Sequence, residues 1–169
     1  GNWNRGKRDK ESTLLLWLQA VKAEEANADA FAHIGLYYQQ VEGDMERAER
    51  CFRKALTLGC RLPEAIVGLA EVELAKGQFV QAVRLLEPVV EDRPELTAAW
   101  QCMGLALFSL ASYNRAAHAL QTCLKGQRGG SGREYVRLLL LLGHAYQRDG
   151  KLQAALKAFS RVAQVSPDC

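Results

Sequence analysis

The residue types best suited to catalysis or metal binding are scattered along this chain. The three histidines, His33, His118 and His144, lie far apart, and none has a histidine or cysteine partner at metal-ligand spacing. The cysteines form no Cys-x-x-Cys pair, and no glycine-rich phosphate-binding motif is present. We therefore expect no catalytic residues, no metal site and no cofactor.

Residues 126–133 are the one glycine-rich stretch. A phosphate loop would need a following Lys-Ser or Lys-Thr pair and a preceding strand, and both are missing. The composition is that of a linker. Two origins stay open: a natural flexible insertion, or an artificially introduced junction.

Four basic residues near the N-terminus could contact phosphate groups: Arg5, Lys7, Arg8 and Lys10. A base-stacking surface would also interleave aromatic residues with the basic ones, and here none is interleaved. We favour a solvated helix face and do not expect direct nucleic-acid binding. RNA contact through this basic cluster, together with Arg128 and Arg133 of the glycine-rich stretch, is the alternative.

The composition is that of an ordinary globular helical protein. Of the 169 residues, 49% are hydrophobic, 24% are charged and only 4 are proline. The longest apolar runs, residues 14–18 and 138–142, are far short of the roughly 20 residues that span a bilayer, so no membrane partner is expected. The net charge of +3 does not by itself indicate nucleic acid. Five cysteines, an odd number, favour reduced thiols and hence cytosol or nucleus.

A repeat runs through the whole chain. A small residue follows a bulky apolar one at Gly35, Ala70, Gly104 and Gly143. Each is followed by a second small residue and then by a large apolar one. These partners are Ala48, Ala82, Ala116 and Ala155, then Phe52, Leu86, Leu120 and Phe159. The spacing predicts pairs of amphipathic helices, in which small residues let two helices approach and large ones fill the space between pairs.

Glycines mark where the first helix of three pairs should end. Gly43, Gly77 and Gly150 occupy these positions, and glycine adopts the left-handed cap without steric cost. Gly43 comes one residue later than the other spacings predict.

The pattern resembles the tetratricopeptide repeat family, whose unit is a helix-turn-helix of about 34 residues. Residues that match in the first full unit are Phe31, Gly35, Tyr38, Ala48 and Phe52. The resemblance implies an all-α fold, a right-handed α-solenoid. The expected units are a partial repeat at 1–27 with only its second helix (10–23), then repeats at 28–62, 63–96, 97–135 and 136–169. Trp3 would be a remnant of the missing first helix, and we expect the array to continue beyond both ends of the chain.

The first third of the chain is similar, more specifically, to the large tetratricopeptide scaffold subunits of the superkiller complex. Tyr37-Tyr38, Val41, Gly43-Asp44 and Arg47-Ala48 carry this resemblance. It implies a cytoplasmic scaffold that holds an RNA helicase and a propeller subunit in RNA decay. A nuclear location is a further possibility.

The resemblance also implies that the first helices of the repeats line a concave face that binds a partner. Groove positions by register are Leu36, Gln39, Val67, Glu71, Leu74, Gln101, Leu105, Phe108, Leu140, His144 and Arg148. The basic clamp by which related domains hold chaperone tails is missing, so we expect no chaperone binding of that kind. The apolar positions suit an apolar or helical segment of a protein partner. Another part of the same protein filling the groove is the alternative.

We therefore expect a non-catalytic protein-protein interaction scaffold.

Overall fold

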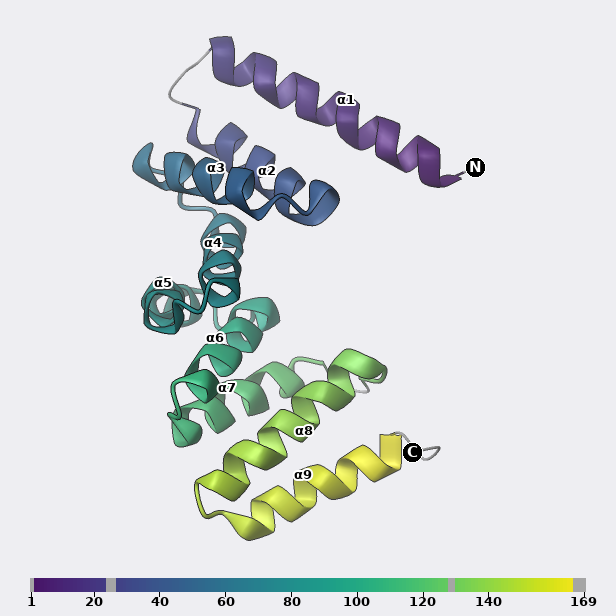
Figure 1. Ribbon diagram of the computed structural model, residues 1–169, viewed down its shortest axis with the longest axis vertical. Helices are drawn as coiled ribbons and strands as arrows, with labels where there is room; N and C mark the ends of the chain where they lie inside the picture. Colours follow the sequence, from purple (N-terminus) through teal and green to yellow (C-terminus); the bar gives the residue numbers. More distant parts are fainter. Residues whose placement is uncertain (1, 24–26, 128–129, 166–169) are drawn as a thin grey trace. The chain divides into compact units, whose positions relative to one another are not determined.

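The computed structural model describes residues 2–23, 27–127 and 130–165, and these residues form helices and no strands. Figure 1 shows the helices in chain order. They are α1 (Asn2–Ala23), α2 (Ala28–Tyr37), the π-helix η1 (Tyr38–Glu42), α3 (Met45–Thr57), α4 (Pro63–Ala75), α5 (Phe79–Asp92), α6 (Thr97–Ser109), α7 (Tyr113–Lys125), α8 (Arg133–Arg148) and α9 (Leu152–Val165). The chain divides into two compact units, Gly1–Val72 and Glu73–Cys169. The all-α expectation is confirmed for the described residues.

In the first unit, polar side chains fix where helices begin. The side chain of Asn27 accepts a hydrogen bond from the Ala30 amide, and that of Asp44 accepts one from the Arg47 amide. These N-caps satisfy amides that have no partner within the helix. The helix pair α2–α3 therefore begins at defined residues, and α1 packs on α2.

The extra residue before Gly43 is absorbed by a π-helix. A π turn holds one residue more than an α turn, so η1 continues α2 in place of a loop. Gly43 then ends the helix in the left-handed conformation, with φ of 65°, and the Asp44 amide donates to the Tyr38 carbonyl at 2.9 Å. The inserted residue therefore widens the last turn of the helix, and Gly43 still serves as its left-handed C-cap.

The small residues of the repeat allow close helix contacts, as predicted. A Cβ atom added to Gly35 would lie 2.7 Å from the Phe52 ring. One added to Gly104 would lie 2.7 Å from Leu120, and one added to Gly143 would lie 2.5 Å from Phe159. At these three positions glycine thus leaves room for a large side chain from the second helix of the pair.

The second unit is built on the pairs α6–α7 and α8–α9. Its buried core includes Leu120, Cys123, Leu138, Leu142 and Ala145. The predicted left-handed glycines Gly77 and Gly150 have φ of 78° and 79°. At the end of α6 the same role falls to Ala111, with φ of 60°, which is a strained conformation for a residue with a Cβ atom.

The N-terminal helix differs from the prediction. The expected second helix at 10–23 begins at Asn2, so Trp3 belongs to the same helix and is not a remnant of another one. Arg5, Lys7, Arg8 and Lys10 are good helix formers, and nothing between Trp3 and Lys10 stops the helix.

Candidate functional site

Leu36, a predicted groove residue, lines a pocket of about 270 Å³ between α1 and the α2–η1 helix. Trp17 of α1 stacks on His33 of α2, with ring centroids 5.1 Å apart and planes 18° apart. Tyr37 and Val41 supply further apolar wall, and Lys10 of the basic cluster stands at the same pocket. The structure thus brings Leu36 together with one residue of the basic cluster.

Gln39 and Glu71, both predicted groove residues, bind each other. The Gln39 amide nitrogen donates to a Glu71 carboxylate oxygen at 3.0 Å and to the Gly68 carbonyl at 3.1 Å. Desolvation raises the pKa of Glu71, and the hydrogen bond from Gln39 opposes that shift. Val67, by contrast, is only 7% exposed, so it offers little surface to a partner.

In the second unit, two predicted groove residues meet on a third that the sequence analysis did not single out. The Phe108 ring lies edge-on to Tyr113, with centroids 5.4 Å apart. Arg148 lies 5.6 Å from the Tyr113 ring centroid, and its guanidinium donates to the Tyr113 hydroxyl at 3.0 Å. Tyr113 therefore connects α6, α7 and α8 at this surface. We call these three residues the Tyr113 cluster.

The remaining predicted groove residues of the second unit are mostly accessible. Leu74, Gln101 and Leu105 are half-buried, while Leu140 and His144 are exposed. Gln101 donates to the Glu134 carboxylate at 2.7 Å, and His144 lies edge-on to Phe159 with centroids 5.3 Å apart. These residues of α6 and α8 therefore offer both apolar and polar groups to solvent.

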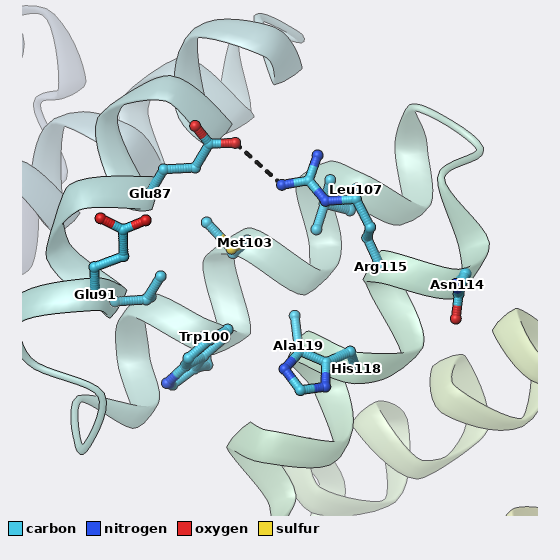
Figure 2. Close-up of a pocket in the computed structure, with 10 residues that line it drawn as sticks. Glu87, Glu91, Trp100, Met103, Leu107, Asn114, Arg115, His118 and Ala119 are labelled. Carbon is cyan, nitrogen blue, oxygen red and sulfur yellow. Dashed lines mark hydrogen bonds and ion pairs between the residues drawn. The ribbon is translucent and has the colours of Figure 1, made fainter.

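A larger pocket, of about 660 Å³, lies between α5, α6 and α7, and the sequence analysis did not predict it. Figure 2 shows the side chains that line this pocket. Among them, Arg115 forms an ion pair with Glu87, at 3.0 Å. Buried apolar side chains, Met103 and Leu107 among them, form its floor. No residue type or spacing in the sequence marks this pocket, because it forms only where side chains of three separate helices come together.

The basic cluster lies exposed along the first turns of α1. Lys7 is 6.0 Å from the ring centroid of Trp3, and Trp3 is 78% exposed. An accessible aromatic ring therefore does accompany the basic residues, contrary to the sequence analysis, because Asn2–Ala23 is one helix. Of the glycine-rich stretch, Arg128 lies outside the described residues, and Arg133 is exposed at the start of α8.

Burial favours the neutral form of three cysteines. Desolvation raises the thiol pKa of Cys51, Cys60 and Cys123. Neutral thiols are poor nucleophiles and poor metal ligands. Within the described ranges, no group of three potential ligands could hold a metal ion, and no helix is long and apolar enough to cross a membrane.

Two of the helix pairs match a known protein family. The tetratricopeptide repeat model matches residues 28–58 and 136–169, which correspond to α2–α3 and α8–α9. Two stretches of this chain, one in each compact unit, therefore match the tetratricopeptide repeat.

Several longer proteins match nearly all of the chain. Tetratricopeptide repeat protein 37 of Xenopus laevis is 29% identical over 164 residues, which is 96% of this chain and 10% of that protein. Human Superkiller complex protein 3 is 26% identical with the same coverage. Superkiller protein 3 of Schizosaccharomyces pombe is 28% identical over 94% of the chain and 11% of its own length. The chain thus spans about a tenth of these relatives, and the resemblance seen in its first third extends over most of it.

Solved structures share the fold. MamA superposes with a TM-score of 0.79 at 20% identity, covering 99% of this chain and 94% of MamA. YrrB, described as a TPR protein with an unusual peptide-binding site, gives 0.79 at 20% identity, covering 99% of this chain and 83% of YrrB. These neighbours confirm the predicted fold class.

Proposed function

We propose that this chain is a non-catalytic scaffold segment that binds a protein partner in an RNA-decay assembly of the superkiller type, in the cytoplasm. The observation that carries the proposal is the similarity to Superkiller complex protein 3 over 96% of the chain. An RNA helicase and a propeller subunit are the partners that this resemblance implies. Because the chain covers a tenth of that relative, other segments of such a protein could bind the same partners.

The surface that we assign to partner binding contains Leu105 and the Tyr113 cluster. Leu105 and Phe108 lie nearly one turn apart on α6, and both remain half-buried in the isolated chain. Arg148 and Tyr113 add hydrogen-bonding groups held in fixed positions by each other. A rigid aromatic and aliphatic anchor flanked by polar groups is what a short helical or extended segment of a partner binds best.

Partner recovery from cell extract tests this assignment. The double variant Leu105→Ala with Phe108→Ala should lose the partner, because anchors of this kind commonly cost more than about 2 kcal/mol of binding energy when truncated. Far-ultraviolet circular dichroism should show unchanged helix content. The control changes Arg5, Lys7 and Arg8 to Ser, and it should retain the partner.

One observation favours a second candidate function, direct RNA contact through α1. Exposed Trp3 beside Lys7, with Arg5, Arg8 and Lys10 nearby, supplies a stacking ring and cations together. Salt separates the two functions. RNA binding should weaken steeply between 50 and 200 mM salt, by roughly tenfold or more, whereas apolar anchoring should change little. Loss of the partner only in the basic-cluster variant would move the function to RNA.

A further inference from the structure

The pocket between α5, α6 and α7 lies away from the proposed partner surface. On α6 the pocket is lined by Trp100, Met103 and Leu107. At about 100° per residue, Leu105 lies roughly 160–200° around the helix from Met103 and Leu107. Phe108 lies about 100° from Leu107 and about 140° from Met103, so the two surfaces use different sides of α6 and each can be tested with its own variants.

The pocket combines an apolar floor with polar walls. Val90, Met103, Leu107 and Ala119 are each no more than 8% exposed and form the floor. Glu87, Glu91, Arg115 and His118 rise around it (Figure 2). At about 660 Å³, it has the size of an ordinary ligand pocket, with room for a long side chain and its neighbours.

The charges in the pocket do not cancel. Arg115 is already paired with Glu87, at 3.0 Å. Glu91, one helical turn after Glu87, has no hydrogen-bond or ion-pair partner among the residues that the structure describes. Glu87, Glu91 and Arg115 together thus leave the lining with one surplus negative charge, on a chain whose net charge is +3.

Trp100 lines the same pocket as the Glu91 carboxylate. Its indole nitrogen donates to the Pro94 carbonyl at 2.8 Å, which fixes the ring orientation before any ligand binds. His118 lies edge-on to the ring, with centroids 5.9 Å apart. Figure 2 shows Trp100 and Glu91 on the α5–α6 side of the pocket.

We propose that this pocket binds an arginine side chain presented by a segment of a protein partner. A guanidinium is planar, stacks on aromatic faces and pairs with carboxylates, so Trp100 and Glu91 suit its two chemical aspects. The aliphatic stem would lie on the apolar floor. An anionic ligand is disfavoured because two carboxylates line the pocket and Arg115 is held by one of them.

An NMR titration of the chain with N-acetyl-L-arginine methylamide tests the proposal. The Trp100 indole resonance is assigned by its loss in Trp100→Phe. It should shift on titration, together with the amide resonances of Glu87 and Glu91. The indole resonances of Trp3 and Trp17 should not shift. The corresponding citrulline compound has nearly the same shape without the charge, and it should bind at least fivefold more weakly. The lysine compound should bind more weakly than arginine.

Charge variants separate a specific pocket from general attraction. Glu91→Gln should weaken arginine binding at least threefold. Glu46→Gln removes an equal, exposed charge from α3 and should leave it unchanged. The Leu105→Ala with Phe108→Ala variant should also bind the arginine compound normally, so the two proposals fail separately. Equal binding of citrulline or lysine, an unaffected Glu91→Gln variant, or a stronger response to acetate would overturn the arginine site.

Discussion

At the scale of single residues, Glu71 shows how a surface hydrogen bond couples to pH. Desolvation raises its pKa above the ordinary value, and the Gln39 amide offsets only part of that shift. The folded chain therefore binds a proton more readily than the unfolded chain at this position. Its contribution to stability is greatest below the ordinary pKa and is lost as the pH rises through the raised value.

Glu71→Gln should remove this pH dependence while keeping an oxygen that can accept from Gln39. We expect the free energy of unfolding at pH 7 to rise by about 0.5 kcal/mol or less, because the side chain is exposed and solvent screens it. At about pH 4, below the ordinary pKa of a glutamate, the gain should disappear. Urea unfolding at the two pH values measures it. A gain that grows toward acid pH would contradict the assigned sign.

Glycine has opposite consequences at two helical positions. At Gly104 an added methyl group would meet Leu120 at 2.7 Å, so Gly104→Ala should cost about 1–3 kcal/mol through overpacking. At Gly6 nothing lies within 4 Å, so Gly6→Ala should stabilise α1 by about 0.5–1 kcal/mol. Thermal unfolding followed by circular dichroism compares the same substitution at both sites. Equal effects would show that the α6–α7 crossing is not limited by this glycine.

At the scale of elements, the π-helix η1 accommodates a one-residue insertion locally. Deleting the exposed Gln40 should let α2 continue as an ordinary α-helix to Gly43, with a change in unfolding free energy below about 1 kcal/mol. Ser109 occupies the matching place in α6, where no extra residue is present. Its deletion should cost more than about 2 kcal/mol, because it rotates the end of α6 and misplaces the turn before α7. Chemical denaturation of both variants measures the difference between their unfolding free energies. Similar losses of stability would contradict the interpretation that the π-helix accommodates an inserted residue.

Some contacts between the elements were predictable from the sequence, and others were not. Contacts such as Gly143 on Phe159 follow from the repeat, because small and large residues recur at fixed spacing within one helix pair. The extra residue before Gly43 was visible, but a loop or a π-helix could equally have absorbed it. Tyr113 and the arginine pocket were not predictable, because each depends on how three helices are placed. The position of Trp3 within α1 was also not predictable, because the start of a helix without a strong N-cap carries little signal in the sequence.

At the scale of the whole molecule, apolar side chains at two separate helices remain uncovered. Leu15 and Leu16 of α1 are 61% and 65% exposed, and Leu152 and Leu156 of α9 are 65% and 61% exposed. The α9 pair lies on one face because its members are four residues apart. Contiguous apolar surface of this kind promotes association in water.

We therefore expect the chain to self-associate reversibly, with an average molar mass that rises with concentration in light scattering after size-exclusion chromatography. Changing Leu152 and Leu156 to Gln, or Leu15 and Leu16 to Gln, should shift this rise to higher concentration without loss of helix content. The control is Val80→Gln on α5, which removes a single exposed apolar side chain, 45% exposed, from another helix. Added sulfate should strengthen association and moderate sodium chloride should barely change it, because the contacts are apolar. A chain that stays monomeric at high concentration would show that these leucines do not drive association.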